Sequence, residues 1–393
     1  MIRLFINGLA ASAGGGLTYL RNVIPHLARR ENVHTTVLLN ANLCREFEER
    51  SNLLLIRGPD FLGSRRRLFY EQTEIPKLIR RSGSHALVSA GNFALWNSPI
   101  PQILLSRNAL YTSADFVRDI RGRGDYAIWA DTLVKGWLAR HSIRDADVTV
   151  APSEAFAREL GQWSGRQVVA IHHGFDAKAF HNNGTGLPDG FEAVLEGGAD
   201  AVRLLFVSHY NYYRNFETLL RAMPIVRRRL QHKNVKLYLT CRLHSNSNPG
   251  NYRAEPAATL LREVRRECEV VELGSISYSA LHHLYRACQI YVTPAYAESF
   301  AHPLVEAMSS GLPVVAADLE VHREICGSAA LYFSRFSPEE LADCVLRIVD
   351  STTLAKDLSS NGLRRSQDFS WERHVTQLLD LAKEVVEARS KCA

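Results

Sequence analysis

The segment Ile290–Ala316 reads IYVTPAYAESFAHPLVEAMSSGLPVVA and decides the fold. Its two ends, Ile290–Thr293 and Pro313–Ala316, are short apolar runs rich in β-branched residues, which is typical of buried strands. Pro303–Ser310 lies between them and starts with proline, a residue suited to the first helical position. A strand, a helix and a second strand in this order predict a parallel βαβ unit.

The same alternation of strands and helices runs along the whole chain. Further strand-like runs are Ile2–Ile6, Thr35–Leu39, Ala86–Ser89, Gln102–Leu105, Val148–Val150, Val168–Ile171, Leu204–Ser208, Val235–Thr240 and Val270–Leu273. The stretch Asn182–Asp200, rich in Gly, Asn and Asp, interrupts the series and predicts a linker. The pattern therefore predicts an α/β protein with two tandem Rossmann-like, doubly wound domains. They are expected to face a cleft at the carboxyl ends of both sheets.

Composition narrows the class of protein. The chain has 393 residues, of which 46% are hydrophobic and 22% charged, so global disorder is excluded. Its seven cysteines include no CxxC pair, which favours reduced thiols in the cytoplasm. No apolar run reaches the roughly 18 residues of a membrane-spanning helix.

The formal net charge of +6 is unevenly distributed. Residues 1–176 contain 22 Lys and Arg against 16 Asp and Glu, whereas residues 177–393 contain 25 of each kind. A basic first half indicates an anionic partner, and a solvated surface is the alternative. The densest cluster, residues 64–81, combines arginines with Leu68, Phe69, Ile75, Leu78 and Ile79. Such a segment fits an anionic membrane surface and equally a packed helix with a basic outer side, whereas no nucleic-acid recognition motif accompanies it.

Two carboxylates frame the loop and the helix start of the opening segment. Glu298 lies in the loop and Glu306 about one turn inside the helix. Acceptor oxygens at this spacing suit hydroxyl groups at the two ends of an elongated ligand, and the amides between them suit a phosphate. The alternative is an ordinary capping turn followed by a solvated Glu306.

A second glycine-rich segment, Ser12–Gly16, follows the strand Ile2–Ile6 and precedes a helix predicted over Leu17–Arg30. Glycines at a helix N-terminus leave amides open to an anion. The spacing matches neither GxGxxG nor a Walker A motif, and a tight turn is an equal alternative.

Several segments together resemble the retaining GT-B fold glycosyltransferases of family 4. Glu298 and Glu306 match the E-x7-E element of that family. The other matching segments are Ala307–Ala316, Arg203–Ala222 (RLLFVSHYNYYRNFETLLRA), His173–Asp176 and Phe369–Glu372. The resemblance is strong over residues 203–372 and looser before residue 170.

The resemblance implies an architecture and an activity. It implies an acceptor-binding domain over residues 1–176, a donor-binding domain over 177–370, and a C-terminal helix over 371–393 that returns to the first domain. It also implies transfer of a sugar from a nucleotide-diphosphate sugar to a hydroxyl of a glycan or lipid-linked acceptor. Cell-surface polysaccharide or lipopolysaccharide synthesis is the expected setting, with no metal and no cofactor.

The resemblance further implies roles for donor-binding residues. Glu306 is expected to bind the ribose and Glu298 the hydroxyls of the sugar, while Arg214 neutralises the leaving diphosphate. The remaining donor contacts are expected from Gly15 and Gly16 of the first domain and from the amides of Ser299, Phe300, Ala301 and His302.

Two positions depart from the family pattern. His209 stands where an Arg is usual, which predicts pH-sensitive donor binding or a lost role, and Arg242 is a candidate for the missing cation. Ala301 and His302 stand where Gly and Leu are common, which predicts a narrower space near the donor.

Loops of the first domain are expected to hold the acceptor. The candidates are Gly91, Asn92, Arg107 and Asn108, and Asn108 joins Arg214 and Glu298 as a catalytic candidate. Many relatives have a His near Asn108, and simple turn formation is an equal alternative for these residues.

The expected location is the cytoplasm, at the inner face of the membrane if residues 64–81 contact it. Asp145 and Asp147 form a D-x-D sequence, but they abut a strand and are not expected to bind metal. Two other function classes stay open: a non-catalytic nucleotide-sugar-binding protein, and a GT-B enzyme of other chemistry such as a nucleotide-sugar epimerase.

Overall fold

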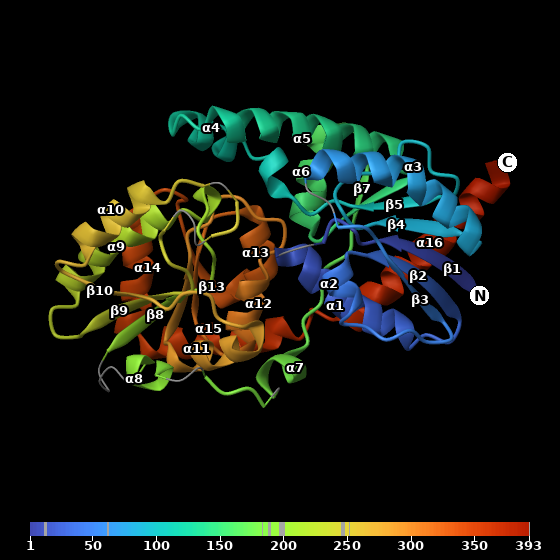
Figure 1. Cartoon of the computed structure of the whole chain (residues 1–393). Coiled ribbons are helices and arrows are strands. Elements are labelled where there is room, and N and C mark those ends of the chain that lie inside the picture. The colour runs from blue at the N-terminus through green and yellow to red at the C-terminus, as the bar shows by residue number, and fades with distance from the viewer. Residues whose placement is uncertain are drawn as a thin grey trace. The chain divides into compact units, whose positions relative to one another are not determined.

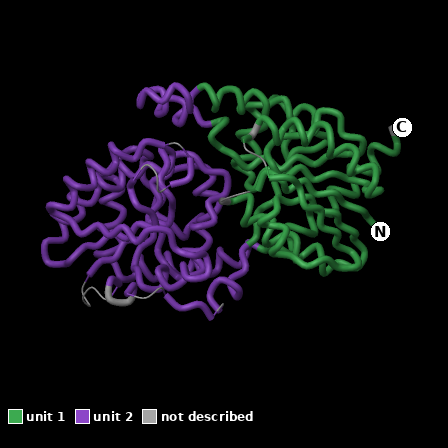
Figure 2. Tube along the Cα trace, in the orientation of Figure 1, with its two compact units in different colours: residues 1–112, 130–174, 370–393 green, residues 113–129, 175–369 purple. Residues whose placement is uncertain are grey.

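The chain forms two compact units in a computed structural model (Figure 2). The structure describes residues 1–11, 14–60, 63–182, 184–187, 190–195, 201–244, 248–250 and 252–392. Unit 1 comprises Met1–Thr112, Ala130–Gly174 and Ser370–Ala393, and unit 2 comprises Ser113–Trp129 and Phe175–Phe369. Ser12 and Ala13 of the predicted glycine loop, much of the predicted linker over 182–200, and residue 393 lie outside the described residues.

Unit 1 is built on a parallel sheet of the order β3-β2-β1-β4-β5-β6-β7 (Figure 1). Its strands are β1 (Ile2–Asn7), β2 (Val33–Leu39), β3 (Leu53–Arg57), β4 (Ala86–Ser89), β5 (Gln102–Leu105), β6 (Val148–Ala151) and β7 (Val168–Ala170). Within β1, Leu4 and Ile6 join the core on one face of the sheet and Phe5 joins the core on the other. Burial on both faces is what a near-continuous apolar strand requires.

Helices cover both faces of this sheet. Those of unit 1 are α1 (Gly14–Ala28), α2 (Ala41–Cys44), α3 (Ser64–Ser82), the 3-10 turn η1 (Ala109–Tyr111), α6 (Glu154–Ser164), α16 (Trp371–Cys392) and most of α5 (Tyr126–Asp145). Helices α1 and α16 share one core with Leu4 and Ile6, whereas α3 packs Ile75 and Ile79 with Phe5 on the other face.

The last helix, α16, is firmly held by unit 1. The ring of His374 contacts the His172 carbonyl oxygen at 2.9 Å and the Tyr19 hydroxyl at 3.0 Å. Burial lowers the pKa of His374 to about 4, so the ring is neutral at pH 7. A Cβ on Gly174 would lie 2.0 Å from the backbone nitrogen of Trp371, so only glycine fits this close approach. The predicted return of the C-terminal helix to the first domain is confirmed.

Unit 2 contains a second parallel sheet, of the order β10-β9-β8-β11-β12-β13. Its strands are β8 (Val202–Phe206), β9 (Val235–Leu239), β10 (Glu269–Glu272), β11 (Ile290–Thr293), β12 (Val314–Ala317) and β13 (Ala330–Phe333). The helices and 3-10 turns are α4 (Ala114–Gly122), α7 (Ala177–His181), α8 (Phe191–Leu195), η2 (Tyr212–Arg214), α9 (Phe216–Arg229), α10 (Glu255–Val264), η4 (Tyr278–Ala280), α11 (Leu281–Ala287), α12 (His302–Ser309), α13 (Glu320–Cys326), η5 (Gly327–Ala329), α14 (Pro338–Asp350) and α15 (Thr352–Ser366). The predicted fold class of two parallel α/β sheets is therefore confirmed.

One segment departs from a simple division of the chain into two halves. Ser113–Trp129, which carries α4 and the start of α5, precedes five elements of unit 1 along the chain yet belongs to unit 2. Two of the four edge strands, β3 and β13, were not predicted from the sequence. Four residues of β3 are partly or fully exposed, so its alternation is weak.

Candidate functional site

The loop between β11 and α12 places a carboxylate against a guanidinium. The carboxylate of Glu298 forms an ion pair with Nη1 of Arg214. The side chain of Glu298 is only 10% exposed and that of Arg214 only 17%. Burial lowers the pKa of Arg214, but the charge of Glu298 and the nearby tyrosines outweigh it and raise this pKa, so the guanidinium stays protonated. Burial has the largest effect on the pKa of Glu298 and raises it, whereas the positive charge of Arg214 lowers it. The structure thus brings together two of the three residues predicted to be catalytic, and each neutralises the other.

Short turns fix the position of Arg214. Its backbone N–H donates to the side-chain oxygen of Asn211, which caps η2. Asn215 follows with φ 54°, a left-handed conformation that Asn tolerates, and its amide nitrogen donates to the Pro294 carbonyl oxygen at 3.1 Å. The Tyr296 N–H donates to the Tyr213 carbonyl oxygen at 3.0 Å. The turn carrying Arg214 and the loop carrying Glu298 are therefore joined directly.

Glu306 lies deeper, on α12, and contacts tyrosines instead of a cation. It is 3% exposed, and its Oε2 accepts a hydrogen bond of 2.8 Å from the Tyr285 hydroxyl. The Tyr278 hydroxyl also bonds to this carboxyl group. Burial raises the pKa of Glu306 to about 7 against the opposing effect of the two tyrosines. The carboxyl group therefore exists in both protonation states near neutral pH.

Tyr291 on β11 lies close enough to both carboxylates for their charges to act on its phenol. The charges of Arg214, Glu298 and Glu306 all affect the pKa of this buried phenol. The centroid of its ring lies 5.8 Å from that of Tyr285. Burial raises the pKa of Tyr291 well above its usual value. Arg214, Glu298 and Glu306 therefore belong to one polar cluster in unit 2. Sequence analysis missed the three tyrosines, because a tyrosine in a strand or helix looks the same whether it packs in a core or bonds to a carboxylate.

The predicted run of open amides is altered by local structure. The Ser299 N–H bonds to the carboxylate of Glu298. Phe300 is buried and lies edge-on to Phe369, with 5.4 Å between ring centroids. Ala301 has φ 64° and ψ 67° and precedes α12, which begins at His302. The departure from Gly at position 301 therefore introduces backbone strain, because an alanine methyl is disfavoured in this left-handed region.

His209 and Arg242, the two positions considered for a further cation, lie in different surroundings. Burial and the charge of Arg214 lower the pKa of His209 to about 4, so this ring is neutral at pH 7. The ring is therefore not expected to change charge near neutral pH, and the role of His209 in donor binding stays a prediction. Arg242 is exposed after β9, where its Nε lies 3.5 Å from the Cβ position of Gly274.

In unit 1, Arg107 joins two predicted groups of residues. Its guanidinium donates to the carbonyl oxygens of Gly15, at 3.4 Å, and of Ala90. Its Nη2 lies 3.6 Å from the Cβ position of Gly16, and its backbone N–H donates to the side-chain oxygen of Asn92 at 2.7 Å. The structure thus unites the glycines assigned to the donor with residues assigned to the acceptor. Gly15 and Gly16 lie in the first turn of α1, which begins three residues earlier than predicted.

The other two acceptor candidates have structural tasks. The side chain of Asn108 caps η1 by accepting the Leu110 N–H at 3.1 Å. A Cβ on Gly91 would lie 2.9 Å from that of Ala10, so the loop is tightly packed there. These contacts are those of turn-forming residues, the alternative that the sequence left open.

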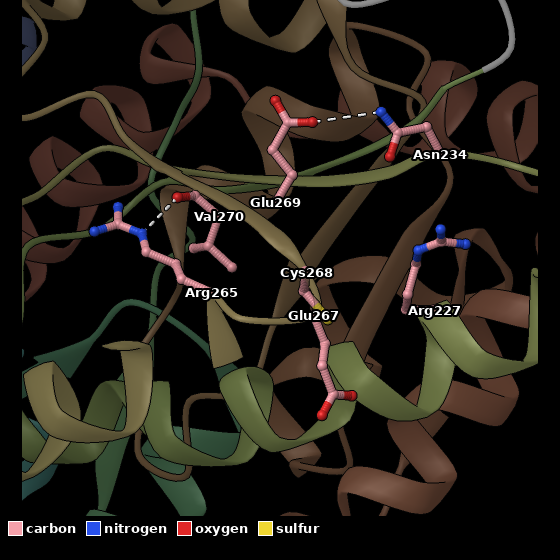
Figure 3. A pocket seen from close by; sticks show the side chains of 7 residues that line it. All are labelled: Arg227, Asn234, Arg265, Glu267, Cys268, Glu269 and Val270. Carbon is pink, nitrogen blue, oxygen red and sulfur yellow. Dashed lines mark hydrogen bonds between the residues drawn. The ribbon is translucent and has the colours of Figure 1, made fainter. Parts of the chain in front are cut away.

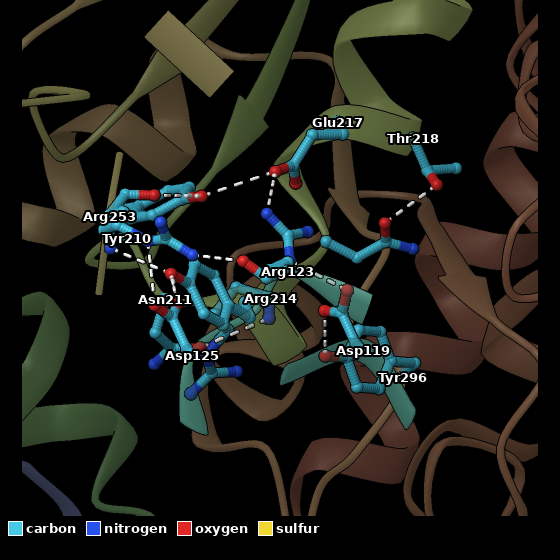
Figure 4. Close-up of polar contacts among 12 residues, drawn as sticks. Asp119, Arg123, Asp125, Tyr210, Asn211, Arg214, Glu217, Thr218, Arg253 and Tyr296 are labelled. Carbon is cyan, nitrogen blue, oxygen red and sulfur yellow. Dashed lines mark hydrogen bonds and ion pairs between the residues drawn. The ribbon is translucent and has the colours of Figure 1, made fainter. Parts of the chain in front are cut away.

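Helix α4 braces the turn that carries Arg214 (Figure 4). Asp119 accepts hydrogen bonds from the Tyr296 hydroxyl at 2.6 Å and from Arg123 at 2.8 Å. Arg123 also donates to Glu217 at 2.9 Å. Asp125 forms further contacts with Tyr212 and Arg253. This network comes from a segment of the first half of the sequence, so spacing gave no sign of it.

Two cavities lie elsewhere in unit 2. One, of about 510 Å³, is lined by residues at the starts of β9 and β10, including Asn234, Cys268 and Glu269 (Figure 3). The other, of about 810 Å³, contains Val202 and Ile290 at the starts of β8 and β11. Both are at the amino ends of the parallel strands, whereas Arg214, Glu298 and Glu306 follow the carboxyl ends of β8 and β11. Neither cavity contains a predicted site residue.

The described residues lack two features. They contain no group of three or more His, Cys, Asp or Glu side chains arranged to hold a metal ion. Within the same residues, every helix is too short or too polar to cross a membrane.

Comparison with known proteins gives two family matches. The model of glycosyl transferases group 1 matches residues 196–365, and the model of glycosyltransferase family 4 matches residues 13–179. Among solved structures, sucrose-phosphate synthase from Thermosynechococcus elongatus has a TM-score of 0.76 at 19% identity, covering 99% of this chain and all of the other. HepE from Anabaena has a TM-score of 0.71 at 15% identity, over 98% of this chain and all of the other. At these identities the structures show the fold.

Curated relatives match over shorter stretches. O-antigen chain mannosyltransferase B of Escherichia coli is 29% identical over 124 residues, which is 32% of each chain. A D-inositol 3-phosphate glycosyltransferase of a Nocardioides species is 24% identical over 287 residues, which is 70% of this chain and 61% of the relative. The matches thus span between a third and two thirds of these relatives. The two family models, the parallel sheets and the neighbouring folds agree: the chain belongs to the GT-B fold glycosyltransferases of family 4.

Proposed function

We propose that the protein is a retaining glycosyltransferase. It moves a sugar from a nucleotide-diphosphate sugar to a hydroxyl of a glycan or lipid-linked acceptor, in the synthesis of a cell-surface polysaccharide or lipopolysaccharide. The observation that carries the proposal is the buried cluster of Arg214, Glu298 and Glu306 after the carboxyl ends of β8 and β11. Parallel α/β sheets bind their ligands at this end of the strands.

Each member of the cluster has a distinct task in this proposal. Glu298 accepts hydrogen bonds from hydroxyls of the donor sugar, and Glu306 accepts them from the ribose. Arg214 contacts the diphosphate with the N–H groups that its single ion pair leaves over. Its Nε is buried and has no hydrogen-bond partner among the described residues, which suits a donor poised for a phosphate oxygen.

The chemical step follows from charge. As the bond between the sugar and the diphosphate breaks, negative charge grows on the departing phosphate oxygen, and a fixed guanidinium stabilises it. The acceptor hydroxyl attacks on the same face, and its proton passes to that phosphate oxygen, so the anomeric configuration is retained. No side-chain nucleophile takes part. Because Glu298 is paired with Arg214 before the donor binds, both groups are already oriented.

The names of related proteins support the choice of substrates. HepE has been solved in complex with UDP-glucose, which is consistent with a nucleotide-diphosphate sugar donor. One curated relative is named for O-antigen chain mannosylation, which supports a cell-surface glycan as product. We place the reaction in the cytoplasm at the inner face of the membrane, with residues 64–81 near anionic lipid and Gly91, Asn92, Arg107 and Asn108 near the acceptor.

Donor-dependent hydrolysis tests the proposal without a known acceptor. Purified protein is incubated with UDP-, GDP-, TDP- and ADP-sugars, and release of the nucleoside diphosphate is measured. We expect release from one class of donor, reduced strongly in Glu306→Ala and Arg214→Ala. The exposed variant Arg229→Ala, which breaks a surface ion pair with Asp343 in the same unit, serves as the matched control and is expected to keep activity.

The outcomes separate the proposal from its alternatives. Binding of a donor with no turnover, even with an extract of cell-surface acceptors, would identify a non-catalytic nucleotide-sugar-binding protein. Conversion of the donor into an epimer would identify the other GT-B chemistry. Unchanged turnover in Arg214→Ala would reject the assigned site.

A further inference from the structure

The basic helix α3 cannot supply an apolar membrane contact by itself. Ile75 and Ile79 are buried in the core beneath it, and Leu78 packs against the same core. The apolar stripe noticed in the sequence therefore faces the sheet. One large apolar residue points outward: Phe69 is 72% exposed, near the exposed Arg65 and Arg66.

Helix α5 differs from α3, because large apolar residues lie on its outward side. Thr132, Gly136 and Ala139 of this helix are buried. On the other side, Leu133 is 45%, Val134 59% and Trp137 60% exposed. A surface helix normally turns polar residues to solvent, so an apolar outer side signals a partner.

The two helices flank the same half-buried residue, Tyr111. Tyr111 packs under α5, where its Cβ lies 3.8 Å from the Cβ position of Gly136. The charges of Asp131 on α5 and Arg67 on α3 both affect the pKa of the same tyrosine. Helices α3 and α5 run next to each other in Figure 1. The exposed side chains of α3 and α5 therefore belong to one region of unit 1.

Carboxylates in this region are largely neutralised by neighbours. Asp131 pairs with Lys135 at 2.7 Å, and Glu74 pairs with Lys77 at 2.7 Å. Glu71 is buried and lies 3.8 Å from Arg67. The exposed arginines Arg65 and Arg66 on α3, with Arg140 and Arg144 on α5, leave the region basic.

We propose that the outer side of α5, together with Phe69, Arg65 and Arg66 of α3, is the surface by which the chain lies on an anionic membrane. Trp137, Val134 and Leu133 enter the boundary between headgroups and acyl chains, where tryptophan is favoured. The arginines of α3 contact lipid phosphates. The proposal rests on the membrane partner named under the proposed function and assigns the apolar part of that contact to α5 rather than to residues 64–81.

Vesicle co-sedimentation of the full chain tests this surface. Vesicles of phosphatidylcholine alone are compared with vesicles in which about one third of the lipid is phosphatidylglycerol. We expect binding to the anionic vesicles only, weakened by salt. The double variant Val134→Ser/Trp137→Ser should lower the partition coefficient roughly tenfold or more. Arg65→Glu/Arg66→Glu should lower it by a similar factor, since each basic residue near the surface contributes about fivefold.

Controls keep this test separate from folding and from catalysis. Phe336→Ser replaces an aromatic residue that is also exposed, but lies in unit 2, and should bind vesicles like the wild type. Thermal unfolding midpoints should agree among all variants. Donor hydrolysis in solution without lipid should be unchanged in the α5 variant, so failure of the membrane surface and failure of the glycosyltransferase proposal give different results.

Three results would overturn the assignment. The first is no binding of the wild type to anionic vesicles. The second is equal binding by the α5 variant and Phe336→Ser. The third is a dimer by light scattering that Val134→Ser/Trp137→Ser converts to a monomer with vesicle binding unchanged, which would assign the surface to a second copy of the chain.

Discussion

The two units use different chemistry at the ends of similar parallel sheets. In unit 2, charged and phenolic side chains contact one another: Arg214 pairs with Glu298, and Glu306 accepts hydrogen bonds from tyrosines. In unit 1, the half-buried cation Arg107 donates to backbone carbonyls of the first turn of α1 and of the loop after β4. In the proposed function the first arrangement offers side-chain oxygens and a cation to a ligand, whereas the second holds backbone segments together. Changes in unit 2 should therefore affect ligand turnover, and changes in unit 1 mainly loop order.

The largest effect is expected from Arg214→Ala. Removing the guanidinium leaves the carboxylate of Glu298 buried without a cation, which destabilises the fold by about 3–5 kcal/mol. Loss of the positive charge near the leaving phosphate should lower donor turnover by roughly 10²–10³-fold. Thermal unfolding and donor hydrolysis measure the two effects.

The double variant Arg214→Ala/Glu298→Ala separates these effects. It removes both charges, so most of the lost stability should return while turnover stays low. If turnover returned together with stability, the pair would serve the fold alone.

Glu306 provides a pH test of unit 2. Its pKa is about 7 in the folded protein against 4.5 as its ordinary value, so the folded state holds the proton more tightly than the unfolded state. The destabilising contribution of this carboxyl group is absent below about pH 4.5, grows as the pH rises to about 7, and reaches about 3 kcal/mol above that.

Glu306→Gln removes this titration. The variant should gain stability relative to the wild type as the pH rises, which denaturant unfolding at about pH 5 and about pH 8 can measure. A constant difference between the two proteins at both pH values would contradict the assigned pKa.

Arg107→Ala sharpens the comparison from the side of unit 1. The variant loses hydrogen bonds to the Gly15 and Ala90 carbonyls, and destabilisation of about 1–3 kcal/mol is expected. Hydrogen exchange should increase in the loops around Gly15 and Asn92, with smaller changes near Glu306. Equal protection of those loops in the variant and the wild type would show that Arg107 does not hold them together.

Ala301→Gly is expected to give the smallest effect, and a favourable one. Glycine accommodates φ 64° without strain, so stability should rise by about 0.5–1 kcal/mol. Ala307→Gly, inside the helix that follows Ala301, is the matched control and should lower stability by about 1 kcal/mol. A loss of stability in both variants would show that Ala301 is not strained.

Much of the fold follows from local sequence. The strands Ala86–Ser89, Gln102–Leu105 and Ile290–Thr293 were predicted with the bounds that the structure has. Each is a short apolar segment between clear turn residues, so local pattern and tertiary environment agree. Helix α4 and the residue after it could not be placed this way. The hydrogen bond from Tyr296 to Asp119 and the ion pair between Arg123 and Glu217 join residues about 90 to 180 positions apart.

The charged residues of the candidate site could be predicted from the sequence, but the residues that contact them could not. The spacing of Glu298 and Glu306 indicated two acceptors near a helix start, and the structure joins both to one cluster. That Glu298 pairs with Arg214, that tyrosines surround Glu306, and that His209 is neutral all depend on burial. Burial is a property of the folded chain, so the residue types alone did not reveal it.

Thermal unfolding with nucleoside diphosphates tests the central claim most directly. UDP, GDP, TDP and ADP are added separately to the wild type and to Arg214→Ala/Glu298→Ala. One of the four should raise the wild-type midpoint by roughly 5 °C at a concentration far above its dissociation constant, and should leave the double variant nearly unchanged. An equal shift in both proteins, or no shift with any of the four, would contradict the assignment of the donor site to this cluster.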